Sequence, residues 1–201
     1  MDRKQHWETV YNTKQPHEVS WTQATPSTSL KFIESCNVPK DAKIIDIGGG
    51  DSNLVDHLLD LGYSNVTVLD ISKKALERAK ARLGDKAKQA TWIVSDITKY
   101  TPEVEYDIWH DRAAFHFLTT KEQIEAYCNI ISNNVKQQLI IGTFSDKGPL
   151  KCSGLEITQY TETSLSTLLA NSFDKEHCIT EEHTTPFNTT QNFLFCRFKR
   201  K

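Results

Sequence analysis

Three consecutive glycines after a short apolar segment carry the clearest chemical meaning in the sequence. Residues 43–47 are Lys-Ile-Ile-Asp-Ile, and Gly48, Gly49 and Gly50 follow them. Glycine lets a backbone turn tightly and approach a ligand closely, because it has no Cβ. In an open α/β sheet, the loop after the first strand lies where ligands bind. We therefore expect these glycines to hold a cofactor.

Two cofactors fit such a loop, a dinucleotide and S-adenosylmethionine. The dinucleotide pattern GxGxxG is met by Gly48 and Gly50, but Asn53 stands at its third glycine. Asp46 adds a carboxylate at the strand end, which disfavours a nearby pyrophosphate. The same carboxylate is well placed to orient the ammonium group of S-adenosylmethionine. The loop therefore favours S-adenosylmethionine.

Two further aspartates follow the next two apolar segments. Asp70 comes after 66–69 and can accept hydrogen bonds from both ribose hydroxyls. Asp96 comes after 91–94 and can accept from the adenine amine, while Ile97 can pack on the ring. A single aspartate is also common in turns and helix caps. Acids at the ends of three consecutive strands are more specific and indicate a nucleoside-containing cofactor.

The segment 110–118 (His-Asp-Arg-Ala-Ala-Phe-His-Phe-Leu) is rich in functional side chains. His110 or His116 could act as a general base near neutral pH. Asp111 could orient a histidine, and Arg112 could bind a carboxylate or phosphate of an acceptor. The alternatives are that His110 only contacts the cofactor, that Asp111 and Arg112 form a structural ion pair, and that His116 packs in a turn.

The elements that position these residues follow from hydrophobic periodicity. Short β-branched segments alternate with helical patterns between 43 and 142 and predict parallel strands. These strands are expected at 43–47, 66–69, 91–94, 106–109 and 139–142. After a helix at 161–171, segments 176–180 and 191–198 are joined only by a turn around Pro186 and Asn188, so they pair antiparallel. The prediction is a doubly wound α/β fold with a seven-stranded mixed sheet whose last strand is antiparallel.

The N-terminal residues are predicted to be helical and irregular. We interpret 1–201 as a single domain in which 1–40 form an extension or lid over a 41–201 core. Aromatic Trp7, Tyr11 and Trp21 could roof the cofactor by cation–π contact and exclude water. Trp7 and Tyr11 also lie four residues apart, so they could instead dock a helix on the core.

Composition excludes several classes of function. The 24 basic and 26 acidic side chains nearly cancel, which argues against nucleic-acid binding. No apolar segment approaches the roughly 20 residues that span a bilayer, and none resembles a signal peptide. Five cysteines without a CxxC pair favour reduced thiols in the cytoplasm over a disulfide framework. His177, Cys178 and His183 match no zinc spacing, so no metal is expected.

Together, these motifs resemble the class I S-adenosylmethionine-dependent methyltransferase family over about residues 43–142. By this resemblance, Asp46, Gly48 and Gly50 match the first motif, Asp70 is the ribose acid, and Asp96 with Ile97 forms the adenine site. We also expect Gly49, Ile71 and His110 to contact the cofactor. The resemblance departs at Ser52, where many members keep a glycine. Segments 110–113 and 144–155 are also similar to a group of small bacterial methyltransferases. The Asp-Arg pair after the fourth strand is loosely similar to thiopurine methyltransferase-like enzymes, which implies a small thiol or related soft nucleophile as acceptor.

The function predicted from this resemblance is methyl transfer from S-adenosylmethionine to a small-molecule acceptor, with His110 the first choice as base. A lysine-specific protein methyltransferase is an alternative. So are an NAD(P)-binding oxidoreductase and a noncatalytic S-adenosylmethionine-binding protein. The (Asn/Asp)-Pro-Pro-(Tyr/Phe) motif of many amine methyltransferases is missing. The acceptor and the oligomeric state stay open.

Overall fold

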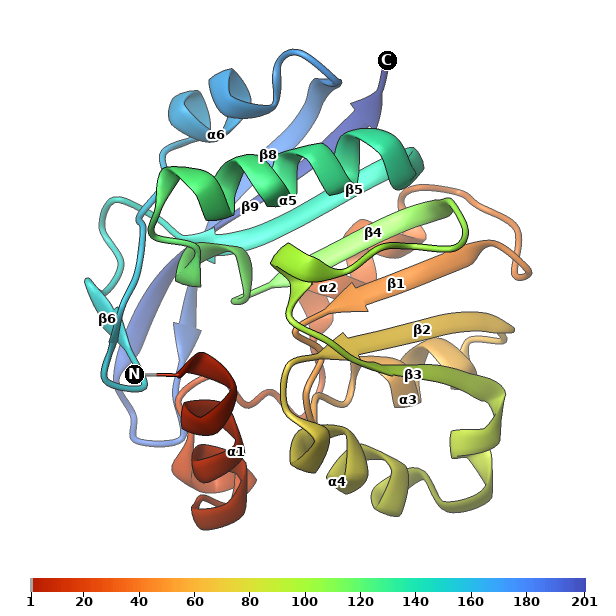
Figure 1. The fold of residues 1–201 in the computed structure, drawn as a ribbon, viewed down its shortest axis with the longest axis vertical. Coiled ribbons are helices and arrows are strands. Elements are labelled where there is room, and N and C mark those ends of the chain that lie inside the picture. Colours follow the sequence, from red (N-terminus) through yellow and green to blue (C-terminus); the bar gives the residue numbers. More distant parts are fainter. Residues whose placement is uncertain (1) are drawn as a thin grey trace.

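A seven-stranded sheet forms the centre of the computed structural model, which describes residues 2–201 (Figure 1). Met1, the first residue of the expected lid, lies outside them. The sheet order is β3-β2-β1-β4-β5-β9-β8. The strands are β1 (Lys43–Ile47), β2 (Asn65–Asp70), β3 (Ala90–Val94), β4 (Tyr106–Arg112), β5 (Val135–Phe144), β8 (Phe173–Thr184) and β9 (Thr190–Arg200).

Strands β1 to β5 are parallel, whereas β9 runs antiparallel to both β5 and β8. The predicted mixed sheet, with the last strand of the chain antiparallel, is therefore confirmed. A two-stranded hairpin of β6 (Lys151–Cys152) and β7 (Leu155–Glu156) was not predicted.

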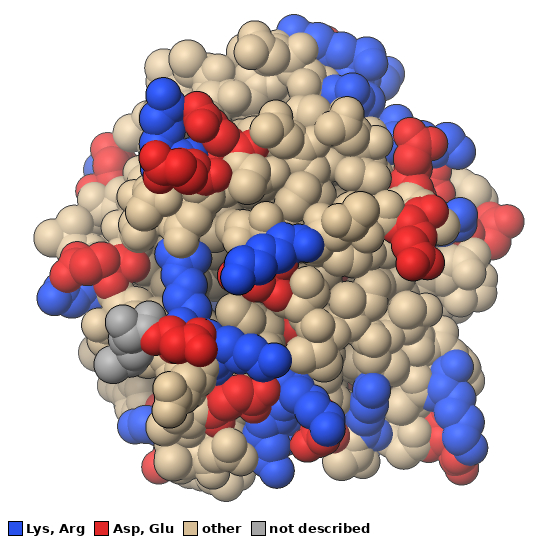
Figure 2. All heavy atoms as spheres, in the orientation of Figure 1, with Lys and Arg blue, Asp and Glu red and all other residues tan. Residues whose placement is uncertain are grey.

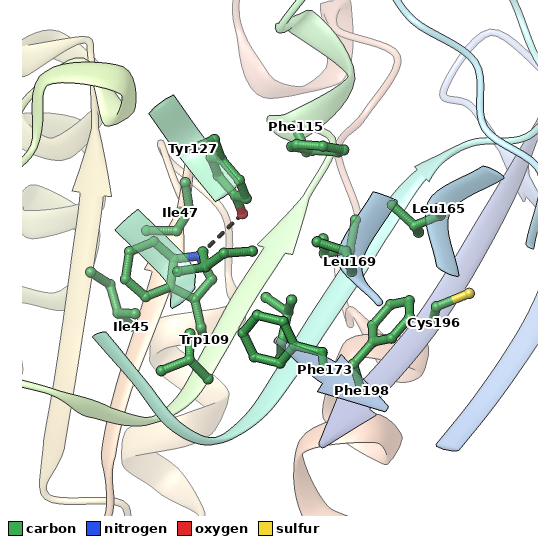
Figure 3. Packing of buried hydrophobic residues seen from close by; sticks show 14 of the residues in the cluster. Ile45, Ile47, Trp109, Phe115, Tyr127, Leu165, Leu169, Phe173, Cys196 and Phe198 are labelled. Carbon is green, nitrogen blue, oxygen red and sulfur yellow. Dashed lines mark hydrogen bonds between the residues drawn. The ribbon is translucent and has the colours of Figure 1, made fainter. Parts of the chain in front are cut away.

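Helices cover both faces of the sheet. They are α1 (Arg3–Thr13), α2 (Ser27–Glu34), α3 (Leu54–Asp60), α4 (Lys73–Leu83), α5 (Lys121–Asn134) and α6 (Glu162–Leu169), with 3-10 turns η1 (Pro16–Glu18), η2 (Gly84–Gln89), η3 (Ile97–Lys99) and η4 (Phe115–Phe117). Successive strand residues point to opposite faces. Ile44 and Ile108 thus pack with α2, α3 and α4, whereas Ile45 and Trp109 pack with α5 and α6. Figure 3 shows the second cluster, where Trp109 donates a hydrogen bond to Tyr127.

Helix boundaries follow the local sequence signals. The Ser72 hydroxyl accepts from the backbone N–H of Ala75 and caps α4. Thr120 and Gln123 form the expected capping box at the start of α5. These caps fix where each helix begins after its strand, and so fix the loops at the carboxyl edge of the sheet.

The cysteine prediction is wrong for one pair. Cys178 on β8 and Cys196 on β9 lie directly opposite each other in the antiparallel register and are joined by a disulfide. Cys36, Cys128 and Cys152 are free. The pairing depends on the register of the β8–β9 hairpin. Cysteine spacing alone carries no information about that register.

The surface and the helices bear on possible partners. On the face shown in Figure 2, basic and acidic side chains are interspersed rather than segregated. Within residues 2–201, no helix has both the length and the apolar character needed to cross a membrane. In the same residues, no three metal-binding side chains gather at one point.

Candidate functional site

A cavity of about 230 Å³ opens at the carboxyl edge of the parallel strands. Its walls come from the loop after β1, from the ends of β2, β3 and β4, and from the N-terminal residues before β1. The predicted cofactor residues that line it are Trp7, Tyr11, Trp21, Asp46, Gly48, Gly49, Asp70, Ile71, Asp96, Ile97 and His110. The fold thus gathers side chains that are far apart in the sequence around one space.

The glycine loop leaves no room for side chains. Gly48 and Gly50 adopt φ angles of +64° and +52°, which disfavour any residue with a Cβ. A Cβ on Gly50 would lie 2.5 Å from the Tyr11 hydroxyl oxygen, and one on Gly48 would lie 2.5 Å from Cβ of Ala114. The loop is therefore a bare backbone cradle between β1 and the N-terminal helix.

Side chains from neighbouring elements brace this cradle. Asn53, at the position of the third dinucleotide glycine, donates to the carbonyl oxygens of Gln23 and Ala24 at 3.2 and 3.1 Å. Arg82 of α4 donates to the carbonyl oxygens of Asp51 and Ser52. The Asn53 side chain therefore attaches the loop to the N-terminal segment. A glycine could not do this, because it has no side chain.

Asp70 and Asp96 differ in their environments. Asp70 is buried and accepts from the backbone N–H of Ser72 at 2.7 Å. Burial raises its pKa to about 7, although hydrogen bonds from the backbone N–H groups of Ser72 and Gly50 oppose the shift. Asp96 caps η3, and its Oδ1 accepts from the backbone N–H and the hydroxyl of Thr98. Each carboxylate therefore accepts two hydrogen bonds, and the two differ in burial, since Asp70 is buried and Asp96 is partly exposed.

His110 lies between two polar side chains inside the cavity wall. Its Nδ1 is 2.7 Å from Oδ1 of Asp46, and its Nε2 is 2.9 Å from the hydroxyl oxygen of Ser29 on α2. All three residues are buried and line the cavity. Because the Asp46 carboxylate accepts the Nδ1 proton, Nε2 is left to accept the proton of Ser29. No sequence signal marked Ser29, since it is an ordinary polar residue in a short helix.

Segment 110–118, which was predicted to contact the acceptor, places its side chains on both faces of the sheet. β4 continues to Arg112, three residues beyond its expected end. Its side chains therefore alternate between faces. His110 and Arg112 line the cavity, whereas Asp111 points to α5 and accepts from the Tyr127 hydroxyl. Asp111 also accepts from the backbone N–H groups of Ala114 and Phe115 and thereby holds η4. It forms no ion pair with Arg112.

His116 is packed rather than presented to the cavity. It is fully buried, stacks on Phe144 with ring centroids 4.4 Å apart, and accepts from the backbone N–H of Phe144. Burial, reinforced by the charge of Arg112, lowers its pKa to about 3. His116 is therefore neutral near pH 7 and lies outside the cavity lining, so we do not carry it into the proposed reaction.

An aromatic cluster roofs the cavity. Trp7 packs on Tyr11, Trp21 and Phe117 with ring centroids 6.3, 5.6 and 5.1 Å apart. Helix α1, which carries Trp7 and Tyr11, lies beside α4 (Figure 1). At its other end, Arg3 donates to the carbonyl oxygen of Phe117 and to the side chain of Gln123. The N-terminal residues therefore close over the strand ends.

Comparisons with known proteins agree with this geometry. A family profile described as "Methyltransferase domain" matches residues 44–138, which include the glycine loop and all three acids. The solved magnesium protoporphyrin IX methyltransferase of Synechocystis PCC 6803 superposes with a TM-score of 0.72 at 18% identity and covers 100% of this chain and 98% of that one. Residues 44–138 therefore match a methyltransferase domain, and the chain has the fold of this solved methyltransferase.

Curated relatives of this methyltransferase domain differ in their acceptors. A malonyl-[acyl-carrier protein] O-methyltransferase of Anoxybacillus flavithermus is 33% identical over 105 residues, which are 52% of this chain and 39% of that protein. An eEF1A lysine and N-terminal methyltransferase of Mus musculus is 27% identical over 99 residues, which are 46% and 14%. The chain thus spans well under half the length of these relatives, and their acceptors do not agree.

Proposed function

We propose that the protein transfers a methyl group from S-adenosylmethionine to a small-molecule acceptor. The observation that carries the proposal is the convergence of the glycine cradle with Asp46, Asp70 and Asp96 on one roofed cavity. Bound S-adenosylmethionine supplies a methyl group already activated on a sulfonium. The protein residues therefore need to orient and desolvate the reactants.

Each cavity element has a part in holding the cofactor. The bare backbone of 48–50 would hold the amino-acid portion beside Asp46. Asp70 would accept from the ribose hydroxyls, because its carboxylate lines the cavity at the end of β2. Ile71 and Ile97 would contact the nucleoside, with Asp96 at the adenine amine. Trp7, Tyr11 and Trp21 would exclude water above them.

Proton transfer is proposed to run through Ser29. With Nδ1–H of His110 donated to Asp46, Nε2 of His110 can take the Ser29 hydroxyl proton while Ser29 takes a proton from an acceptor. His110 would then act as a general base through Ser29 rather than by direct contact. A Ser29→Ala variant is expected to lower kcat at least tenfold and leave S-adenosylhomocysteine affinity unchanged. Unchanged kcat would exclude this route.

The small size of the acceptor is inferred from the roof. The aromatic cluster leaves a limited cavity, and on the face shown in Figure 2 basic and acidic side chains are interspersed rather than gathered by sign. A lysine side chain of a protein is the second candidate, and the similarity to the Mus musculus lysine methyltransferase favours it. Incubation with methyl-labelled S-adenosylmethionine separates the two. Labelling in a protein-free extract supports the small acceptor, and labelling only of proteins contradicts it.

Calorimetric titration tests the cofactor itself. S-adenosylhomocysteine is expected to bind with micromolar affinity, and an Asp70→Ala variant to lose that binding. NADH is the control. Binding of NADH in place of S-adenosylhomocysteine would overturn the proposal in favour of an oxidoreductase. S-adenosylhomocysteine binding without methyl transfer to any extract would favour a noncatalytic binding protein.

A further inference from the structure

Arg112 carries two hydrogen-bond donors that nothing in the described part of the chain satisfies. Its Nη1 donates to the carbonyl oxygen of Trp21 at 3.0 Å. Its Nε and Nη2 are shielded from solvent and have no partner among residues 2–201. In the same residues, no carboxylate lies within ion-pair distance of it, although the cavity reaches this side chain. Buried donors of a charged group are normally paired, because leaving them unpaired costs free energy.

The charge persists in this environment. Burial lowers the pKa of Arg112 to about 10, so the guanidinium remains positive near pH 7. The charges of Glu181 and Asp46 act on it and favour the protonated form. Each is engaged elsewhere: Glu181 accepts from the Thr28 hydroxyl, and Asp46 accepts from His110. The protein thus maintains a cation beside the cavity without assigning it a carboxylate.

Arg112 lies on the side of the site nearest β9. The glycine cradle, Asp70 and Asp96 follow β1, β2 and β3. Arg112, at the end of β4, instead reaches toward β9, where its guanidinium carbon is 4.9 Å from the ring centroid of Phe193. Cys152 of β6 lines the cavity on the same side. This side is where an acceptor would enter opposite the donor.

The arrangement of the two unpaired donors of Arg112 indicates which kind of group could bind them. Nε–H and Nη2–H lie side by side along one edge of the planar guanidinium. That edge matches two oxygens of one carboxylate or phosphate in a bidentate pair. A neutral acceptor would leave both donors unpaired.

We propose that Arg112 binds an anionic group of the methyl acceptor, so that the substrates are small acids presenting two oxygens to this edge. The proposal rests on the proposed function, because it presumes a bound donor on the other half of the cavity. An anion of the same chemistry also occurs in the cofactor, whose methionine portion ends in a carboxylate. The experiment must therefore separate these two sources.

Titration of benzoate and its neutral isostere benzamide into the protein saturated with S-adenosylhomocysteine tests the proposal. Benzoate is expected to bind at least tenfold more tightly than benzamide at constant ionic strength. Arg112→Gln should abolish this preference. Arg112→Lys should retain part of it, since lysine keeps the positive charge but lacks the two parallel N–H donors of the guanidinium. Arg200→Gln is the matched control, because Arg200 also lies over a phenylalanine ring of the sheet but is outside the cavity lining.

The outcomes are separable. Equal binding of benzoate and benzamide to the wild-type protein would overturn the proposal, even if the Arg112→Gln variant did not fold. A tenfold loss of S-adenosylhomocysteine affinity in Arg112→Gln, without loss for 5′-methylthioadenosine, would assign Arg112 to the cofactor carboxylate and also overturn it. Failure of the wild-type protein to bind S-adenosylhomocysteine at all would instead refute the proposed function.

Discussion

Glu8 of helix α1 accepts a hydrogen bond from the backbone N–H of Lys73, the first residue of helix α4, at 2.7 Å. The same carboxylate accepts from the backbone N–H of Lys74 and the hydroxyl of Ser72. A negative charge at a helix N-terminus is favoured by the helix dipole and by the free N–H groups of the first turn. Glu8 therefore attaches the helix that carries Trp7 and Tyr11 to the core.

Replacing Glu8 should loosen this attachment. A Glu8→Ala variant is expected to lose about 1–2 kcal/mol in the free energy of unfolding, as for removal of a helix cap. It should also bind S-adenosylhomocysteine about tenfold more weakly, since the aromatic roof is no longer held. Glu77→Ala, which removes only an exposed pair with Lys73, is the control. Equal affinities of the two variants in calorimetry would contradict this role.

Substitution of Gly50 separates backbone strain from steric blockage. Gly50→Ala adds a Cβ at 2.5 Å from the Tyr11 hydroxyl, whereas Gly62→Ala, also at positive φ, meets nothing within 4 Å. Both should lose about 1–2 kcal/mol of stability, because each forces a left-handed conformation on alanine. Only Gly50→Ala should also abolish S-adenosylhomocysteine binding. A Gly50→Ala protein that binds normally would show that the cradle is not used.

The titration of Asp70 predicts how cofactor affinity depends on pH. Burial raises its pKa to about 7, and under the proposed function ribose hydroxyls would donate to the ionised form. Below pH 7 the carboxyl must first release its proton, so affinity should fall by about tenfold for each pH unit. Above pH 7 affinity should level off. Asp70→Asn should bind weakly with no such slope between pH 5.5 and 7, and a flat wild-type profile would refute the assignment.

The disulfide predicts how many thiols react. Alkylation of the denatured, unreduced protein should label Cys36, Cys128 and Cys152 alone, and prior reduction should raise the count to five by mass spectrometry. Reduction should also lower the free energy of unfolding by about 2–4 kcal/mol, the usual range for such a cross-link. Five labelled cysteines without reduction would show that the pair is not oxidised.

The parallel strands and the polar residues at their ends could be predicted because each depends on local pattern. Buried strands such as 43–47 are continuous apolar segments, and their polar ends must meet at one edge of a parallel sheet. Residues on the proposed acceptor side were harder to predict, because β4 continues three residues beyond the end of its apolar pattern. That extension turned Asp111 toward α5 and left Arg112 in the cavity.

Other features depend on long-range contacts that no local pattern encodes. Ser29 reaches His110 from 81 residues away, and Cys178 meets Cys196 only through the hairpin register. Glu8 gave no signal either, since a lone acid in an N-terminal helix is typical of a solvated surface.

The first helix is held over the cavity at two points, by Arg3 at η4 and by Glu8, in the middle of the helix, at α4. Under the proposed function, a spent cofactor leaves only after these contacts break. The frequency of that opening then sets a ceiling on turnover, however fast the methyl group moves. Two homologues with identical cavities would work at different speeds if they differed only in this helix. Solvent viscosity would slow the one with the weaker fastening least.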